Sequence, residues 1–158
     1  FLCVVGKSKN HLGNSKYMTI IQKKEDGGTP EINLDEELKN GHFVLELINK
    51  QLIASSHDVG EGGILVAIAE MCIAGNLGVT IDTNPEFPHG FYFGEDQSRY
   101  LIEIKAENFD QLKQIAKSKN VDFDKIGVIN REIIRINNSN GIKITKLKKN
   151  FEQGVENI

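Results

Sequence analysis

The sequence predicts a single α+β domain over residues 1–158, with a mixed β-sheet covered by helices. Three observations support this fold class. Short apolar runs of strand length alternate with longer segments of helical periodicity, without the regular β–α–β repeat of an all-parallel sheet. A glycine-rich turn near the middle of the chain leads into an apolar helix. Towards the end, residues 137–141 separate two apolar runs in the way a β-hairpin turn does.

The predicted strands are short, and some are wholly apolar. The first is Leu2–Val5, which ends at Gly6. Further strands are expected at residues 53–57, 78–83, 98–104, 125–129, 132–136 and 141–147. Polar or proline-containing segments at residues 7–14, 23–30 and 84–90 are predicted to be loops or irregular connections. Residues 15–22 fit either a short helix or a strand.

The first predicted helix covers about residues 34–51 and begins with the spacing of a capping box, Asn33 followed by Glu36. Apolar residues and one glycine recur along it every three or four positions. We expect this stripe to face the core: Leu34, Leu38, Gly41, Leu45, Ile48 and Leu52. His42 falls outside the stripe and is expected to be exposed and chemically idle.

Three more helices are expected. Residues 64–74 contain one charged side chain, Glu70, and a helix that is apolar on nearly every side belongs in the middle of a domain. Residues 107–119 carry apolar side chains on one face, which predicts an amphipathic surface helix. Residues 148–157 are predicted to form a short closing helix.

Composition excludes two classes of partner. The net charge of −3 and scattered lysines argue against a nucleic-acid surface. No apolar run reaches the length of a membrane span, so no membrane partner is expected. The two cysteines, Cys3 and Cys72, lie in apolar surroundings, which favours buried reduced thiols in a cytosolic protein, with a disulfide as the open alternative. Because the chain opens directly in an apolar run at Phe1, we expect it to be part of a longer polypeptide.

The glycine turn is the first candidate site. It contains His57, Asp58, Glu61, Gly62 and Gly63, directly before the apolar helix. The unpaired amides and the positive dipole end of a helix N-terminus attract anions, so this loop could face a phosphate. Two simpler readings remain open: Asp58 caps the helix while the glycines only permit close packing, or His57 is an ordinary buried histidine with one satisfied ring nitrogen. The turn matches neither a P-loop nor a dinucleotide-binding fingerprint.

A second polar turn contains Glu95, Asp96, Gln97 and Arg99. Its acceptor groups could bind a ribose, an amide or Mg²⁺. The simpler reading is an ordinary turn in which Glu95 pairs with Arg99. No Ser–His–Asp or Cys–His arrangement and no zinc-ligand spacing stands out, so no catalytic residue and no metal site are assigned.

Three segments resemble motifs of the phosphoribosylformylglycinamidine synthase family, within the aminoimidazole ribonucleotide synthetase superfamily. Residues 57–71 (His-Asp-Val-Gly-Glu-Gly-Gly-Ile-Leu-Val-Ala-Ile-Ala-Glu-Met) are similar to a His-Asp-Val-Ser-(Asp/Glu)-Gly-Gly segment followed by its helix. Residues 93–99 resemble Phe-(Gly/Ser)-Glu-Ser-Gln-x-Arg, and residues 12–17 resemble Leu-Gly-Gly-Ser-x-Tyr. Gly60 and Asp96 depart from this pattern, since the family usually has serine at both places.

The resemblance implies that this chain is the C-terminal domain of such an enzyme. The full-length protein would use ATP, Mg²⁺ and glutamine or ammonia to convert formylglycinamide ribonucleotide into formylglycinamidine ribonucleotide. Its partners would be its own N-terminal domains, with glutaminase and small accessory subunits. The nucleotide-binding lysine and the catalytic histidine lie in those N-terminal domains, so the isolated chain is expected to be inactive.

Two alternatives remain open: a C-terminal domain of a sister enzyme such as aminoimidazole ribonucleotide synthetase, and a non-catalytic binding module. A domain from a larger enzyme also has neighbours to contact. The aromatic residues Phe87, Phe91, Tyr92 and Phe93 are therefore expected to form an interface, with at least two of the rings exposed. The alternative is that these rings fold back onto the domain's own core.

Overall fold

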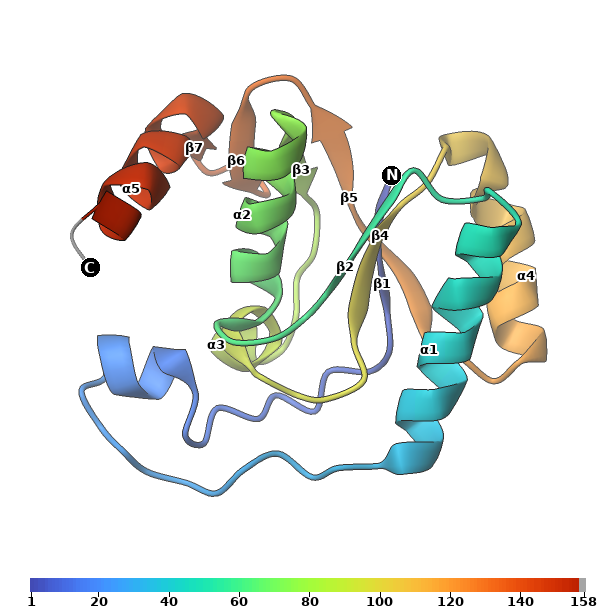
Figure 1. Ribbon diagram of the computed structural model, residues 1–158, viewed down its shortest axis with the longest axis horizontal. Coiled ribbons are helices and arrows are strands. Elements are labelled where there is room, and N and C mark those ends of the chain that lie inside the picture. Colours follow the sequence, from blue (N-terminus) through green and yellow to red (C-terminus); the bar gives the residue numbers. More distant parts are fainter. Residues whose placement is uncertain (157–158) are drawn as a thin grey trace.

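The computed structural model describes residues 1–156. One curved sheet of seven strands separates two layers of helices (Figure 1). The strands are β1 (Leu2–Val5), β2 (Ser55–Asp58), β3 (Gly78–Ile81), β4 (Tyr100–Glu103), β5 (Phe123–Asn130), β6 (Ile133–Ile136) and β7 (Ile142–Lys143). The α-helices are α1 (Leu34–Asn49), α2 (Gly63–Gly75), α3 (Pro88–Phe93), α4 (Phe109–Ser118) and α5 (Ile144–Glu156). A π-helical turn, η1 (Tyr17–Ile21), and a 3₁₀ turn, η2 (Ala106–Asn108), complete the elements.

The predicted mixed sheet is confirmed. Its strand order is β2-β4-β1-β5-β3-β6-β7, and every neighbouring pair is antiparallel except β3 with β6. The predicted hairpin is β6–β7, whose register joins Ile134 to Ile142. No helix within residues 1–156 is long and apolar enough to cross a membrane.

Strand β1 contributes side chains to both hydrophobic cores, one on each face of the sheet. Leu2 and Val4 belong to the core under α2 and α3, whereas Cys3 and Val5 belong to the core under α1 and α4. Successive side chains of a strand point to opposite faces, so a central strand with helices on both sides must be apolar throughout. This accounts for the unbroken Leu-Cys-Val-Val run. Both cysteines are buried and free, as predicted.

Several predicted boundaries are wrong. Residues 84–90 are only partly irregular, since α3 begins at Pro88, where a proline suits the first turn of a helix. The predicted strand 141–147 is reduced to β7, and α5 begins at Ile144 instead of Lys148. The predicted end of that helix at Asn157 lies outside the described residues. Residues 15–22, for which two readings remained open, contain the π-helical turn η1.

Helix α1 begins at the predicted N-cap, Asn33, but the Glu36 carboxylate pairs with the Lys9 Nζ instead of completing a capping box, and the helix buries a different face. The Asn33 side chain accepts hydrogen bonds from the amides of Asp35 and Glu36, both at 3.1 Å. The buried face consists of Asn40, Phe43, Val44 and Leu47. The predicted core stripe is largely in solvent: Leu34 is 75% exposed, Leu38 60%, Leu45 53% and Ile48 45%. His42 is exposed, as expected.

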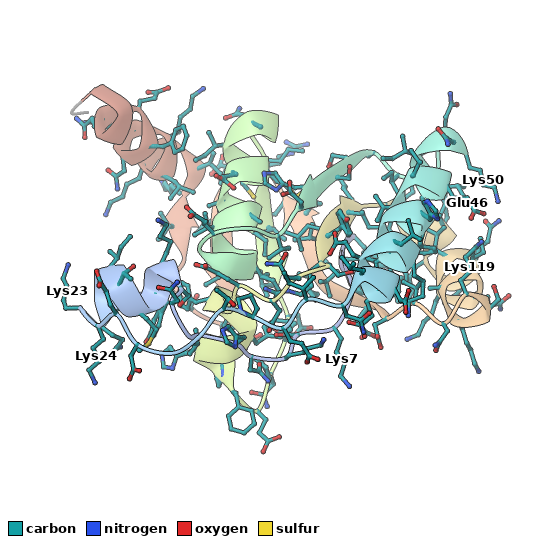
Figure 2. The ribbon with its side chains drawn as sticks, turned by 60° about the horizontal axis from the view of Figure 1, so that its bottom comes forward. Lys7, Lys23, Lys24, Glu46, Lys50 and Lys119 are labelled. Carbon is teal, nitrogen blue, oxygen red and sulfur yellow. The ribbon has the colours of Figure 1, made fainter. Side chains whose placement is uncertain are left out.

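The C-terminal end of α1 is tied to α4 by an ion-pair cluster (Figure 2). A carboxylate oxygen of Glu46 lies 2.6 Å from the Lys50 Nζ, and the other lies 2.8 Å from the Lys119 Nζ. The hydrogen bonds from Lys119 and Lys50 lower the pKa of Glu46 to about 2. Helix α2, expected to be surrounded by protein, instead covers the opposite face of the sheet and exposes Val66, Glu70 and Ala74 to solvent.

Candidate functional site

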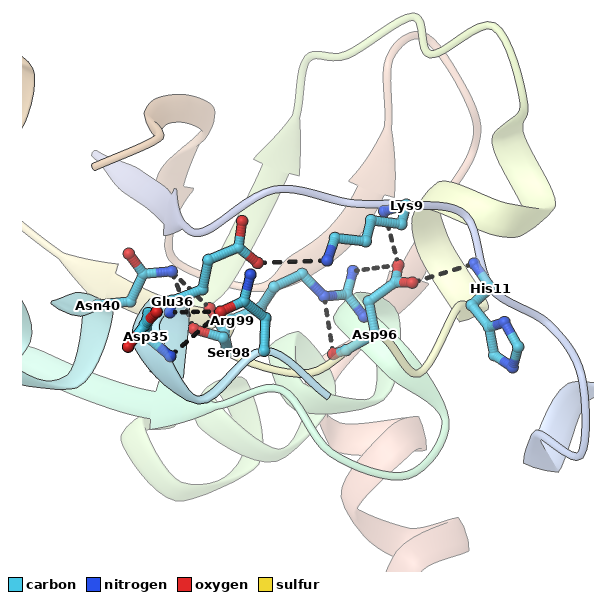
Figure 3. A network of polar contacts seen from close by, with 9 residues as sticks. Lys9, His11, Asp35, Glu36, Asn40, Asp96, Ser98 and Arg99 are labelled. Carbon is cyan, nitrogen blue, oxygen red and sulfur yellow. Dashed lines mark hydrogen bonds and ion pairs between the residues drawn. The ribbon is translucent and has the colours of Figure 1, made fainter. Parts of the chain in front are cut away.

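The three motif-like segments meet at one end of the sheet. They are the glycine turn between β2 and α2, the polar turn between α3 and β4, and the loop that follows β1. Two neighbouring carboxylates of the polar turn, Glu95 and Asp96, join the three segments by hydrogen bonds. Figure 3 shows the part of this network around Asp96 and Arg99.

Glu95 connects the polar turn to the start of α2. Its Oε1 accepts hydrogen bonds from the backbone amides of Gly62 at 2.8 Å and of Lys16 at 2.7 Å. Gly62 is the N-cap residue of α2 and has no side chain with which to cap the helix. A carboxylate is stabilised at this position because the helix N-terminus carries partial positive charge and unpaired amides. The chain therefore supplies its own anion to the helix end where an external phosphate was predicted.

Asp58 does not cap α2. Its side chain is 81% exposed at the end of β2, and three glycine-turn residues separate it from the helix N-cap. The alternative reading in which Asp58 is the cap is therefore wrong. Glu95, which is distant in sequence, occupies the place that a local cap would take.

Asp96 holds the loop that follows β1. It is 2% exposed, and its carboxylate accepts hydrogen bonds from the amides of Lys9 at 2.9 Å and His11 at 3.2 Å. The hydroxyl of Ser8 lies 3.3 Å from the same group. These donors use both carboxylate oxygens. The prediction that Asp96 is an open ligand for a ribose, an amide or Mg²⁺ is therefore not supported by its surroundings, since its acceptor capacity serves the loop.

Arg99 is buried beside Asp96 and is 2% exposed (Figure 3). Its Nε donates to the Asp96 carbonyl at 3.2 Å, and its Nη2 donates to the Gly94 carbonyl at 2.5 Å. Its Nη1 lies 3.9 Å from an Asp96 carboxylate oxygen and has no hydrogen-bond partner among the described residues. Burial lowers the pKa of Arg99, and the charges of Asp96 and Glu95 oppose that shift. The expected Glu95–Arg99 pair is thus replaced by an Asp96–Arg99 pair.

The glycines of the turn have different requirements. Gly62 and Gly63 have φ values of +81° and +73°, a region that favours glycine. A Cβ on Gly63 would stand 2.6 Å from the Gly94 carbonyl oxygen, so the two turns approach too closely for a side chain. This confirms the prediction that backbone geometry requires these two glycines. A Cβ on Gly60 would meet nothing within 4 Å.

The remaining predicted site residues face solvent. Asp58, Glu61 and Gln97 are exposed, and His57 is partly exposed. The Nε2 of His57 lies 3.5 Å from a Glu70 carboxylate oxygen on α2, and Glu61 lies 3.4 Å from the Lys16 Nζ. The structure therefore divides the predicted residues into an internal frame of Gly62, Gly63, Glu95, Asp96 and Arg99 and an accessible set of His57, Asp58, Glu61 and Gln97.

Sequence reasoning missed the polar anchor under α1. Asn40 is 5% exposed, and its Nδ2 donates to the carbonyl and the hydroxyl of Ser98, both at 3.0 Å. Its buried position on α1 ties the helix to the polar turn. The signal that could have identified it is helical spacing: Asn40 precedes Phe43, Val44 and Leu47 by three, four and seven positions and therefore shares their face of the helix.

The prediction of an exposed aromatic interface is largely wrong. Only Phe87, at 59% exposure, is an exposed ring; Phe91 and Phe93 are partly buried against the core, and Tyr92 is buried. Tyr17 of η1 stacks on Phe93 with ring centroids 5.0 Å apart. These rings therefore fasten α3 to the rest of the domain instead of forming an open surface.

The described residues contain no cluster of metal-ligating side chains. Within residues 1–156, no three His, Cys, Asp or Glu side chains lie close enough to hold a metal ion. The carboxylates of Glu95 and Asp96 are already used by backbone amides.

Known proteins share both the sequence and the fold of this chain. Phosphoribosylformylglycinamidine synthase subunit PurL of Pelagibacter ubique is 37% identical over 158 residues, which is 99% of this chain but 22% of that protein. T. maritima PurL complexed with FGAR superimposes with a TM-score of 0.75 at 18% identity, over 93% of this chain and 27% of the other. T. maritima PurL complexed with ATP superimposes with a TM-score of 0.69, over 93% of this chain and 25% of the other.

The chain thus spans about a fifth of the length of the curated relative. At 18% identity the solved structures establish the shared fold alone. The family model described as "AIR synthase related protein, C-terminal domain" matches residues 2–135, which include all three motif-like segments. The chain therefore belongs to the AIR synthase related protein family, as an example of its C-terminal domain.

Proposed function

We propose that this chain is the C-terminal domain of a phosphoribosylformylglycinamidine synthase. The complete enzyme joins ammonia, supplied by glutamine, to formylglycinamide ribonucleotide and cleaves ATP to ADP and phosphate. The observation that carries the proposal is 37% identity to such a subunit over 99% of this chain. Relatives that match at 32–39% over nearly the whole chain carry the same name, which favours this enzyme over its sister synthetases.

The domain contributes a rigid frame and an accessible rim to this enzyme. The frame is the network through which Glu95, Asp96 and Arg99 fix three loops at one end of the sheet. The rim consists of His57, Asp58, Glu61 and Gln97 and faces polar groups of a substrate. The exposed carboxylates of Asp58 and Glu61 oppose a phosphate at this place. Polar side chains on loops positioned by a fixed scaffold are the usual form of a binding surface.

The ATP chemistry belongs elsewhere in the longer protein. The residues described here gather no three-ligand metal cluster, and the carboxylates of half-buried Glu95 and buried Asp96 accept hydrogen bonds from backbone amides. We propose that Mg²⁺ and ATP bind in the N-terminal domains of the complete enzyme, where the family resemblance places the nucleotide-binding lysine, and that this enzyme works in the cytoplasm with its glutaminase and small subunits. The isolated chain is then expected to release no phosphate from ATP with Mg²⁺, ammonia and formylglycinamide ribonucleotide.

A domain exchange tests this function. The chain replaces the corresponding C-terminal segment of the Pelagibacter ubique subunit, and the chimera is expressed in a bacterium that lacks its own synthase. Growth without added purine is expected. A matched chimera carrying Gly63→Val, in which the two turns clash, should not support growth. A soluble chimera that fails to support growth, or the same rescue by the Gly63→Val chimera, would contradict the proposal.

A further inference from the structure

A cavity of about 360 Å³ lies between the C-terminal half of α2 and the sheet. Most of its lining is apolar and comes from both layers: Leu2, Ile68, Met71, Cys72, Val79 and Ile129. Small-molecule sites have volumes of roughly 300–1,000 Å³ and are mostly apolar with a few polar groups. Helix α2 ends at the opposite end of the sheet from the polar turn (Figure 1), so the cavity is separate from the candidate site and shares only His57 with it.

One carboxylate lines this cavity without a cation to pair with it. Glu103 of β4 is partly buried, and its Oε2 accepts a hydrogen bond from the Ser55 hydroxyl at 3.0 Å. Among residues 1–156 no ion pair involves Glu103, and the described lining contains no lysine or arginine. Burial raises the pKa of Cys72, and the Glu103 charge adds to this shift, which agrees with a carboxylate close to that thiol. A partly desolvated carboxylate regains favourable interactions when a cation binds beside it.

The end of α2 adds negative charge to the same cavity. Ala74 and Gly75 belong to the lining, and the last turn of α2 has no basic side chain. A helix C-terminus carries partial negative charge because its last carbonyls have no partner within the helix. His57 is the one basic side chain in the described lining, and its Nε2 lies 3.5 Å from a Glu70 carboxylate oxygen, so a carboxylate already faces it. The cavity is therefore complementary to a cation.

We propose that this cavity binds a small molecule that carries a protonated amine on an apolar ring or chain. The ammonium group donates to the Glu103 carboxylate near the end of α2, in a charge-assisted hydrogen bond. The apolar body lies between α2 and the sheet, where the flexible Met71 side chain adapts to its shape. This site is separate from the rim proposed for the synthase substrate, so either proposal can fail alone.

Tryptamine tests the proposal directly, because the chain contains no tryptophan and the indole emission comes from the ligand alone. Its fluorescence anisotropy should rise as the chain is added, with a dissociation constant of about 1 mM or lower. Tryptophol, which has a hydroxyl in place of the amine, should bind about tenfold more weakly, and indole-3-propionate more weakly still. Equal binding of tryptamine and tryptophol, or no rise at about 2 mM chain, would contradict the proposal.

A matched pair of variants tests the role of the carboxylate. Glu103→Gln keeps the size of the side chain and an acceptor for the Ser55 hydroxyl but removes the charge. It should weaken tryptamine binding about tenfold and leave tryptophol binding unchanged. The control is Glu107→Gln, at an exposed carboxylate 4.0 Å from Lys105 and outside the cavity, which should change neither affinity. Unchanged tryptamine binding in Glu103→Gln, or an equal loss in the control, would overturn the assignment.

Methyl NMR locates the ligand and does not depend on the glutamine variants folding. The chain has two methionines, of which Met71 lines the cavity and Met18 belongs to η1. With isotope-labelled methionine methyl groups, tryptamine should shift the Met71 signal through the ring current of the indole and leave the Met18 signal in place. A Met18→Leu variant assigns the two signals. Equal shifts of both signals, or no shift of the Met71 signal, would exclude this cavity as the site.

Discussion

The Oε1 of Glu95 lies 2.8 Å from the backbone nitrogen of Gly62, so the polar turn caps the helix that follows the glycine turn. The two residues are separated by 33 positions in the sequence. This contact converts a helix end that resembles an anion-binding site into an internal joint. It also explains how two motif-like segments act as one unit: the first supplies unpaired amides, and the second supplies the charge that satisfies them.

Removing the Glu95 carboxylate should therefore destabilise the domain. We expect Glu95→Ala to lower the free energy of unfolding by about 2 kcal/mol, since two backbone amides lose a charged acceptor. Glu95→Gln keeps an acceptor oxygen and should cost about half as much. Urea denaturation measures both changes. Glu61→Ala, which removes a neighbouring exposed carboxylate, is the control and should change stability by less than about 0.5 kcal/mol.

The glycine turn predicts a sharp contrast between substitutions at two positions three residues apart. Gly63→Ala should cost about 2–4 kcal/mol, because the residue has φ of +73° and a Cβ would meet the Phe93–Gly94 backbone at 2.6–2.8 Å. Gly60→Ala has open space around its Cβ and should be nearly neutral. Thermal unfolding of the two variants measures the difference. Similar melting temperatures would show that the two turns can separate without loss.

The fold class, the hairpin and the glycine requirement were predictable from the sequence because each depends on local pattern. The orientation of α1 was not. Both of its stripes have helical periodicity, and the stripe with more leucines is the exposed one. The buried stripe is selected by tertiary contacts: Phe43 packs on Phe123, and Asn40 bonds Ser98. Periodicity identifies an amphipathic helix but does not choose between two apolar faces.

The sequence identified the residues of the candidate site, but it did not show which of them are buried in the hydrogen-bond network and which are exposed. Nothing in the local sequence distinguishes Asp96, which is buried, from Gln97, which is exposed. The difference arises because the loop after β1 crosses above the polar turn and places the amides of Lys9 and His11 on Asp96. Such a contact between segments 85–87 residues apart leaves no periodic signal.

The buried thiols predict a loss of stability at alkaline pH. Burial raises the pKa of Cys72 to about 11, from an ordinary value of 9.0. Between these pH values the unfolded thiol ionises while the folded thiol keeps its proton, so the unfolded state binds fewer protons and stability falls as pH rises. Urea denaturation between pH 8.5 and 10.5 should show this decrease. The decrease should be smaller in Cys72→Ala, whatever the stability of this variant at pH 7. If the free energy of unfolding of the variant fell with pH as steeply as that of the wild type, the decrease would not come from the Cys72 thiol.

The buried Asp96–Arg99 pair predicts strongly non-additive substitutions. Asp96→Asn removes the charge that faces Arg99, whose Nη1 has no other polar contact among the described residues, and should cost about 3 kcal/mol. Arg99→Met removes the donors to the Asp96 and Gly94 carbonyls and leaves the carboxylate buried without a counter-charge, at a similar cost. In the double variant neither charge remains, so its loss should be smaller than the sum of the two by about 1–3 kcal/mol. Urea denaturation of all four proteins at pH 7 gives this coupling energy. Strict additivity would mean that the two side chains act independently and that the loops are held by the backbone hydrogen bonds of Asp96 alone.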